Sequence, residues 1–369
     1  MTVAPDGGIL LLGPTLLSRF TPDGRPDEAF GVAGAIPIDF AADGVSAARG
    51  LAVQPDGRIL VTGYTRVGDQ YDVAVARYLG DGTPDPDFGV GGLVSADFGG
   101  DSDQGQAVLV QPDGRIVVAG NAWMGSEPPG NDLAAARYAP DGTPDPGFGT
   151  GGKVSIDVAG RTDLAAAGLL QPDGRVVVIG RVADGGGDDP DLGLVRWTVD
   201  GRPDPTFGTA GVVRTNFGRP GWWQPAAAAL QPDGRIVVVG RGDTAGAYAV
   251  TRLDPDGTPD LSFGVGGVVT TPLGAGDATA RAVLVQPDGR IVVAGYANAD
   301  PISTATVLRY LPDGTVDPDF ARGGRAELAF FGAGGQVACL AAGPDGTLLV
   351  AGSAINVNAG VLALARLLP

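Results

Sequence analysis

Short apolar runs, separated by turns rich in glycine, proline and aspartate, recur along the whole chain of 369 residues. In a representative unit the runs predict four strands, at Ala107–Gln111, Arg115–Gly120, Leu133–Tyr138 and Lys153–Val158. Proline presets φ for a turn and glycine permits the positive φ that follows, so the Pro-Asp-Gly and Asp-Gly sequences between the runs are expected to form tight turns. Because no long window carries a helical period, the pattern predicts an all-β protein.

The Pro-Asp-Gly turn marks a repeat. Its aspartate occurs seven times, at intervals of roughly 50 to 60 residues, at Asp6, Asp56, Asp113, Asp173, Asp233, Asp288 and Asp345. A second Asp-Gly turn and a Pro-Asp-Pro-x-Phe-Gly signature, such as Pro144–Gly149, follow in six units, and the seventh stops at Pro369 before its second turn. We therefore expect a single domain over residues 1–369: an all-β, seven-bladed β-propeller of four-stranded antiparallel blades, with a three-stranded or irregularly closed last blade.

Three linked motifs resemble the delta-60 repeat family: Gln111–Gly120 (QPDGRIVVAG), Ala136–Tyr138 (ARY) and Asp141–Gly149 (DGTPDPGFG). They recur in order over nearly the whole chain, and the resemblance implies a β-propeller scaffold without implying a catalytic residue. Members of that family tend to be long secreted or surface proteins. This chain departs from them, because its N-terminal sequence lacks a basic segment and a long apolar run, so we expect a cytoplasmic protein.

The net charge and the missing residue types exclude several functions. A formal charge of −17 opposes binding to nucleic acid and to anionic membranes. The chain has no histidine, which removes Ser-His-Asp and Cys-His catalysis and most zinc, copper and iron sites, and Lys153 is its single lysine. The acidic run Asp184–Asp191 lacks the ordered spacing of a calcium loop, so a solvated loop is the favoured interpretation. We therefore expect no cofactor and no metal.

Charges that recur in nearly every unit are interpreted as scaffold. An arginine occupies each third strand, at Arg19, Arg77, Arg137, Arg196, Arg252, Arg309 and Arg366, and aspartates recur in both turns. A charge repeated in every blade cannot mark one asymmetric site. We therefore expect Arg–Asp bonds that tie a strand to a turn.

Functional residues are expected where the repeat fails. In a meandering propeller the loops after second and fourth strands share one face, and these loops differ in every unit, whereas the Pro-Asp-Gly turns repeat on the other face. On the variable face we predict ligand-binding residues at Tyr64, Trp123, Arg161, Arg181, Trp222, Trp223, Gln224 and Tyr296. Tryptophans on loops favour an apolar binding surface, but they are also consistent with side chains that plug the channel mouth or cover blade edges.

One position in the first strands also varies. Five residues before the turn glutamine stand Arg49, Gln106 and Arg281, where other units carry alanine. First strands are innermost in a propeller, so these side chains are predicted to line the channel and to hold a carboxylate or an enol oxygen. The alternative is that they hydrate the channel or bond loop carbonyls.

Two classes of function remain open. The first is a propeller that binds a small organic ligand in an aromatic and arginine-lined pocket on the variable face. This class extends to a cofactor-free cyclisation, isomerisation, lyase or pericyclic step on an apolar substrate. The second is a non-enzymatic scaffold for a protein or glycan partner. The aromatic residues and channel arginines favour the first class, and the sequence leaves catalysis undecided.

Overall fold

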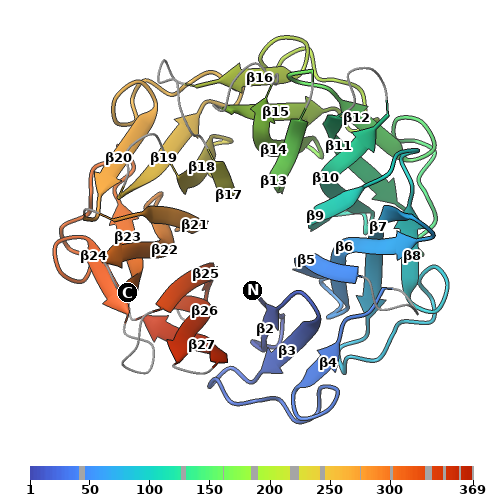
Figure 1. The fold of residues 1–369 in the computed structure, drawn as a ribbon, viewed down its shortest axis with the longest axis horizontal. Helices are drawn as coiled ribbons and strands as arrows, with labels where there is room; N and C mark the ends of the chain where they lie inside the picture. Colours follow the sequence, from blue (N-terminus) through green and yellow to red (C-terminus); the bar gives the residue numbers. More distant parts are fainter. Residues whose placement is uncertain are drawn as a thin grey trace. The chain divides into compact units, whose positions relative to one another are not determined.

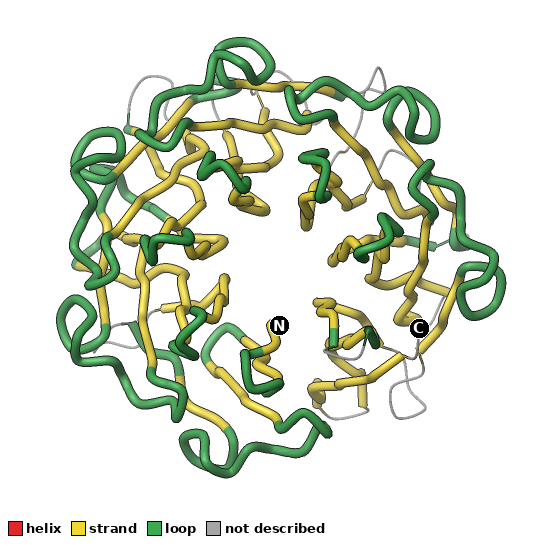
Figure 2. The backbone as a smooth tube through the Cα atoms, turned by 180° about the vertical axis from the view of Figure 1, so that it is seen from behind, coloured by secondary structure: helices red, strands yellow, loops and turns green. Residues whose placement is uncertain are grey.

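The computed structural model describes residues 1–40, 46–125, 130–160, 162–183, 190–216, 224–241, 246–274, 276–299, 302–328, 335–343, 346–356 and 359–367. These residues form only strands and loops, as the colouring in Figure 2 shows, and they contain no apolar helix of membrane-spanning length. The chain divides into two compact units. The first comprises Met1–Gly187, Gly193–Pro205 and Thr209–Val212, and the second comprises Asp188–Leu192, Thr206–Gly208 and Val213–Pro369.

The N-terminal part of the chain folds into antiparallel meanders (Figure 1). Two sheets are four-stranded, in the orders β1-β2-β3-β4 and β5-β6-β7-β8, and a third has eight strands in the order β16-β15-β14-β13-β11-β10-β9, with β12 paired to β11. The strands are β1 Thr2–Val3, β2 Ile9–Leu12, β3 Leu16–Phe20, β4 Ala35–Pro37, β5 Ser46–Val53, β6 Ile59–Val67, β7 Gln70–Tyr78, β8 Leu93–Ala96, β9 Gln104–Val110, β10 Ile116–Met124, β11 Gly130–Tyr138, β12 Lys153–Ile156, β13 Thr162–Leu170, β14 Val176–Ala183, β15 Asp191–Trp197 and β16 Val212–Thr215.

The second unit contains two further four-stranded sheets, β17 to β20 and β21 to β24, and one three-stranded sheet, β25 to β27. The three-stranded sheet is the short last sheet that the truncated seventh repeat predicts. The strands are β17 Gln224–Leu230, β18 Ile236–Arg241, β19 Ala247–Leu253, β20 Val268–Pro272, β21 Ala278–Val285, β22 Ile291–Ala299, β23 Ile302–Tyr310, β24 Arg325–Leu328, β25 Gly335–Ala342, β26 Leu348–Asn356 and β27 Ala359–Leu367.

The described residues form six sheets, where the sequence predicted seven separate blades. The difference arises in the eight-stranded sheet, because β11 and β13 are joined by one parallel residue pair, Asn131 with Thr162. On either side of that pair, β10 with β11 and β13 with β14 form long antiparallel ladders. The predicted all-β class and its four-stranded antiparallel sheets are confirmed.

The repeated charges hold the turns, as expected. Arg137 on β11 donates through Nε to Asp145 Oδ2 at 2.8 Å, and Arg115 Nε lies 2.9 Å from the same oxygen. Both Arg137 and Asp145 are buried. The same three-residue clamp recurs in other repeats as Arg58–Asp85–Arg77, Arg175–Asp204–Arg196, Arg235–Asp260–Arg252 and Arg290–Asp317–Arg309. Each clamp ties a first turn and a third strand to the Pro-Asp-Pro segment, which confirms the scaffold interpretation.

Within each unit, successive sheets pack face to face through apolar side chains. In the first unit, Leu10 and Leu17 share a core with Ile59 and Val61 of the next sheet. Equivalent cores join the later sheets of each unit. The first strands of the repeats also lie together: β5 with β9 between two sheets and β9 with β13 within the eight-stranded sheet of the first unit, and β17 with β21 in the second unit.

Candidate ligand-binding site

Eight of the eleven predicted site residues lie in the part of the chain that the structure describes. The first unit contains Arg49 on β5, Tyr64 on β6, Gln106 on β9, Trp123 on β10 and Arg181 on β14, and the second contains Gln224 on β17, Arg281 on β21 and Tyr296 on β22. Arg161, Trp222 and Trp223 lie outside the described residues, as does most of the acidic run Asp184–Asp191.

Tyr64, Trp123 and Tyr296 lie on strands and not on the loops where the sequence placed them. β6 pairs with β7 as far as Val67 and Gln70, so a two-residue turn closes that hairpin. The strands extend beyond their apolar runs because backbone pairing continues where the side chains become polar, and apolar periodicity does not detect this continuation. These aromatic side chains are therefore held by paired backbone close to the loops.

The variable position in the first strands is a β-bulge in every case. The register between first and second strands shifts by one residue, which leaves one extra residue on the first strand outside the pairing. The extra residues are Arg49, Gln106 and Ala166 in the first unit, and Ala226, Arg281 and Ala338 in the second. A bulge re-aims a side chain, so the position that varies in sequence is also the position where the strand departs from regular geometry.

A glycine on the second strand faces each bulge. A Cβ on Gly63 would lie 1.9 Å from the Ala47 carbonyl oxygen, and one on Gly120 would lie 2.0 Å from the Gln104 carbonyl oxygen. No side chain fits at these distances. The glycine that ends each apolar run of the repeat is therefore required by the bulge, and the equivalent glycines are Gly180, Gly240, Gly295 and Gly352.

Arg49 and Tyr64 form the first arginine–tyrosine pair. Arg49 is exposed, and its guanidinium carbon lies 5.7 Å from the centroid of the Tyr64 ring. The Tyr64 ring also meets Tyr71 edge to face, with ring centroids 5.5 Å apart. The sequence analysis missed Tyr71, and the signal that would have placed it is the two-residue turn between Val67 and Gln70. Among the described residues, no carboxylate lies within ion-pair distance of Arg49.

Arg281 and Tyr296 form an equivalent pair in the second unit. Arg281 is the exposed bulge residue of β21, and its guanidinium carbon lies 5.2 Å from the centroid of the Tyr296 ring. Tyr296 follows Gly295 as Tyr64 follows Gly63. Within the described ranges, Arg281 also has no ion-pair partner. Among the residues that the structure describes, each unit therefore carries one such pair, built on the same kind of bulge.

In two other repeats the cation comes from the second strand. Where the bulge residue is Ala166 or Ala226, the residue after the facing glycine is Arg181 or Arg241. Arg241, which was not among the predicted site residues, is bonded to Asp277 at 3.0 Å. Arg181 is half-buried and has no ion pair in the portion of the chain that the structure describes. An arginine near the bulge can therefore come from the first strand, as the bulge residue, or from the second strand, as the residue after the facing glycine.

The remaining described site residues are polar or aromatic and half-buried. Gln106 occupies its bulge in the first unit. The Trp123 backbone N–H donates to Asp103 Oδ1 at 3.0 Å, which anchors the end of β10. Gln224 in the second unit pairs with Arg241 across β17 and β18. Gln106 therefore occupies a bulge, and Trp123 and Gln224 lie near the ends of their strands.

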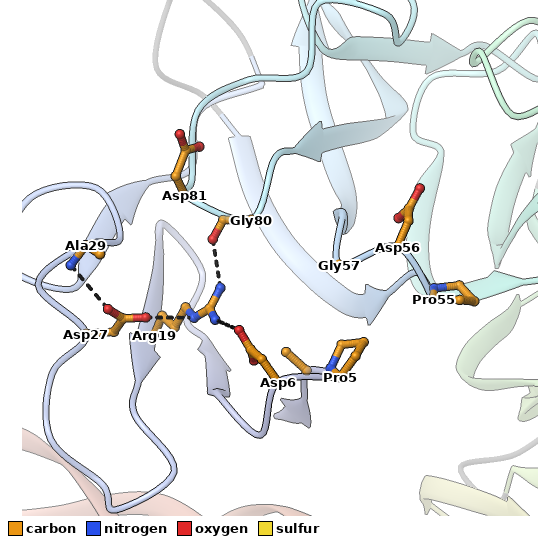
Figure 3. A pocket seen from close by; sticks show the side chains of 11 residues that line it. Pro5, Asp6, Arg19, Asp27, Ala29, Pro55, Asp56, Gly57, Gly80 and Asp81 are labelled. Carbon is orange, nitrogen blue, oxygen red and sulfur yellow. Dashed lines mark hydrogen bonds and ion pairs between the residues drawn. The ribbon is translucent and has the colours of Figure 1, made fainter.

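A cavity of about 490 Å³ lies at the turn ends of the strands in the first unit, where the sequence predicted no site (Figure 3). Arg19 projects into it, donates to the Gly80 carbonyl oxygen at 2.7 Å, and forms ion pairs with Asp6 and with Asp27, the latter at 2.9 Å. Gly8 stands where most other repeats carry a turn arginine, so space that would be filled elsewhere is open here. The arginine in this cavity is already bound by carboxylates.

Many solved structures are similar to this chain in fold, and three of them serve as examples. They are a protein of unknown function from Dyadobacter fermentans DSM 18053 (13% identity, 86% of this chain and 93% of that chain, TM-score 0.50), hydrazine synthase of Kuenenia stuttgartiensis (15%, 99% and 94%, 0.55) and an α-L-arabinofuranosidase from Fusarium graminearum (10%, 86% and 91%, 0.50). At these identities the likeness concerns the fold alone.

No curated protein matches the sequence significantly. The model of one protein family, described as a domain of unknown function (DUF5122) β-propeller, matches residues 54–88, 111–148, 171–207, 231–263, 286–320 and 343–369. The matched segments begin at or near the turn glutamines, and all but the last run to the phenylalanine of the second signature, so the family model covers the turns and clamps described above. Together they span more than half of the chain, which therefore belongs to the DUF5122 β-propeller family.

Proposed function

We propose that this protein binds a small organic ligand through an anionic or enolic oxygen, which one arginine–tyrosine pair at a bulge holds. The observation that carries this proposal is Arg49, an exposed arginine without an ion-pair partner among the described residues, in a chain of net charge −17. Scaffold arginines such as Arg58 and Arg137 are bound to aspartates. An unpaired guanidinium in so acidic a protein is available to an external anion.

The local structure favours binding of a planar oxygen-bearing group. A guanidinium presents several N–H donors in a fixed plane, which suits a carboxylate or an enolate. The Tyr64 ring beneath Arg49 restricts the arginine by a cation–π contact, and Tyr71 supports that ring from its edge. The two aromatic rings also offer apolar surface to the rest of the ligand. Arg281 and Tyr296 supply the same groups in the second unit.

The same donors are suited to catalysis as well as to binding. A cyclisation, isomerisation, lyase or pericyclic step that develops negative charge on oxygen is accelerated by hydrogen-bond donors already aimed at that oxygen. Arg49 and the Tyr64 hydroxyl are the donors that we assign to this role. Catalytic conversion of the bound ligand therefore extends the proposal, and it is measured in the same mass spectrometry experiment that tests binding.

We also propose that the chain forms seven blades of delta-60 repeats. The seven Pro-Asp-Gly turns support this count, and so does the single residue pair, Asn131 with Thr162, that joins two otherwise complete meanders into the eight-stranded sheet. Under this proposal the three-stranded sheet of β25 to β27 is the seventh blade.

Native mass spectrometry with a defined library tests the binding function. The library pairs hydrophobic carboxylic acids and enols with their methyl esters and ethers, which keep the shape but lose the anion. We expect the purified protein to retain one or more acids or enols and not their neutral partners. Replacing Arg49 by Gln removes a charge-assisted hydrogen bond of about 1.5–3 kcal/mol, which lowers affinity by roughly 10- to 100-fold.

The matched control is Arg66→Gln, on the neighbouring strand β6 that also carries Tyr64. Arg66 is bonded to Asp69 at 3.3 Å and to the Gly68 carbonyl oxygen at 2.9 Å, so this change also removes one positive charge but leaves the arginine–tyrosine pair. Equal loss in both variants would show that only net charge matters. The proposal would be refuted if the protein retained the neutral esters and ethers as well as the acids. It would also be refuted if the protein retained no small molecule and a protein or glycan partner were recovered instead, and this second result would favour an interaction scaffold.

A further inference from the structure

Three aspartates converge where β7, β8 and β9 meet in the first unit. Asp72 lies on β7, Asp97 directly follows β8, and Asp103 directly precedes β9. Each offers a carboxylate oxygen, and these oxygens all lie within 4.8 Å of one another. Asp72 is 7% exposed and Asp103 is 0% exposed, whereas Asp97 is exposed. The cluster is therefore buried on one side and open to solvent on the other.

The three carboxylates differ in their protein partners. Asp103 accepts backbone N–H donors at both oxygens, from Phe98 at 2.7 Å and from Trp123 at 3.0 Å. Asp72 receives neither a hydrogen bond nor an ion pair from the described residues, although it is more than nine-tenths buried. A buried carboxylate without a partner is costly, so Asp72 is the member of the cluster whose charge requires a cation.

Equivalent positions in the next two repeats are satisfied within the protein. Asp132, one repeat after Asp72, is half-buried, and burial with the Asp157 charge raises its pKa to about 6. It accepts a hydrogen bond from Ser155, which favours the charged form. Asp191, one repeat further, is bonded to Arg214 Nε at 2.6 Å. Of these three equivalent aspartates, Asp72 is the one that receives neither a hydrogen bond nor an ion pair from the described residues.

The surroundings concentrate negative charge. Burial raises the pKa of Asp103 to about 6, against the two backbone hydrogen bonds that lower it, and the Asp97 and Asp72 charges add to the rise. Burial and the Asp97 charge also raise the pKa of Asp72, while Lys153 lowers it. Lys153 Nζ donates to the Asp97 backbone carbonyl at 2.5 Å and lies over the Phe98 ring, and it forms no ion pair with these carboxylates. At neutral pH the cluster therefore attracts a further cation.

We propose that Asp72, Asp97 and Asp103 bind one Ca²⁺ ion. Two oxygens that share a Ca²⁺ ion at about 2.4 Å are at most about 4.8 Å apart, which is the limit within which these three oxygens lie. Mg²⁺ demands a near-ideal octahedral geometry and gives up its water reluctantly, whereas Ca²⁺ accepts irregular sets of carboxylate ligands. Carboxylate oxygens are the ligands that Ca²⁺ prefers, and water fills its remaining positions on the exposed side.

The ion links three segments that are far apart in sequence. Asp72 comes from the third strand of one sheet, Asp97 from the connection after its fourth strand, and Asp103 from the start of the next sheet. Through Asp103 the ion also braces the backbone of Trp123 at the end of β10. We therefore expect calcium to stabilise the first unit. This inference is independent of the proposed ligand-binding function, because it uses none of the arginine–tyrosine pairs.

Calorimetric titration of calcium chloride alone into the EDTA-treated, dialysed full chain tests the proposal. At about pH 7.5 we expect one Ca²⁺ per chain and a higher unfolding temperature in calcium than in EDTA. Asp72→Asn is expected to lower the calcium affinity at least about tenfold and to remove the calcium-dependent rise in unfolding temperature. Asp132→Asn, at the equivalent position of the next repeat, is the matched control and is expected to bind calcium as the wild type does.

Two further variants keep the test decisive. Asp97→Asn changes an exposed ligand that a folded protein tolerates, and it is also expected to weaken calcium binding. Terbium placed in the site is expected to luminesce on excitation of tryptophan, and Trp123→Phe is expected to reduce that signal while calcium affinity is kept. The proposal is overturned if the wild type shows neither heat of binding nor a change in unfolding temperature at about 5 mM calcium. It is also overturned if Asp72→Asn and Asp97→Asn bind calcium as tightly as the wild type.

Discussion

Replacing Asp145 by Asn removes the shared anion of one clamp. Asp145 Oδ2 is bonded to Arg137 at 2.8 Å and to Arg115 at 2.9 Å, and its Oδ1 accepts the Gly147 N–H at 2.9 Å. Asparagine keeps the shape and can still accept from Gly147. It leaves the guanidinium of Arg137 without a carboxylate, and Arg137 is only 7% exposed.

The expected cost follows from that burial. Breaking a buried ion pair by removing one partner costs about 3–5 kcal/mol, because the other charge stays buried. Arg137 keeps hydrogen bonds to the Val199 carbonyl at 2.5 Å and to the Gly147 carbonyl at 3.2 Å. These bonds offset part of the loss, so we expect the free energy of unfolding to fall by about 3 kcal/mol. Asp113→Asn breaks the exposed pair with Arg115 and is expected to cost less than about 1 kcal/mol.

Urea unfolding followed by tryptophan fluorescence, to which the buried Trp197 contributes, measures both variants. Burial alone would raise the pKa of Asp145, but the Gly147 hydrogen bond and the charges of Arg137 and Arg115 lower it overall. The clamp therefore contributes stability above the unfolded-state pKa, and this contribution is lost as the pH falls through the folded-state pKa. Asp145→Asn should lose less stability than the wild type on acidification below about pH 4. A cost for Asp145→Asn no larger than that for Asp113→Asn would refute the reasoning.

Two other changes test the bulge and the buried acids. Gly120→Ala places a Cβ 2.0 Å from the Gln104 carbonyl oxygen and should cost about 3 kcal/mol in urea unfolding, whereas Gly125→Ala, with open space around it, should be nearly neutral. Burial, with the Asp157 and Asp132 charges, raises the pKa of Asp163 to about 7, against a hydrogen bond from Val158. A raised carboxyl pKa means that stability falls as the pH rises from about 4 to 7, so Asp163→Asn should flatten that slope; an unchanged slope would contradict the assignment.

The sequence predicted the scaffold well because the scaffold is periodic. The Pro-Asp-Gly turns, the recurrent arginine and the Pro-Asp-Pro signature are each repeated, and repetition separates structure from local variation. The clamp of Arg137 and Asp145 followed from that argument. The number of separate sheets did not follow, because one backbone pair between Asn131 and Thr162 depends on how closely two strands approach, which no side-chain pattern records.

The sequence predicted which positions belong to the candidate site, but it did not predict the backbone geometry at those positions. Arg49 and Arg281 were singled out because they break the alanine pattern, but a bulge is a mismatch between two strands and is invisible in one strand alone. Tyr64 was expected on a loop because apolar periodicity does not follow backbone pairing beyond the apolar run, and the signal that would have placed it is the two-residue turn between β6 and β7. The aspartates of the calcium proposal were overlooked for a similar reason: Asp72 and Asp103 become neighbours only through strand pairing, and their spacing matches no calcium loop.

A crystal structure with a carboxylic acid retained from the library tests the central claim most directly. The account predicts that the carboxylate lies within hydrogen-bonding distance of the guanidinium of Arg49 or Arg281, with the apolar part of the ligand against Tyr64 or Tyr296. A ligand bound in the turn-end cavity beside Arg19, or one bound with neither arginine in contact with its carboxylate, would contradict it.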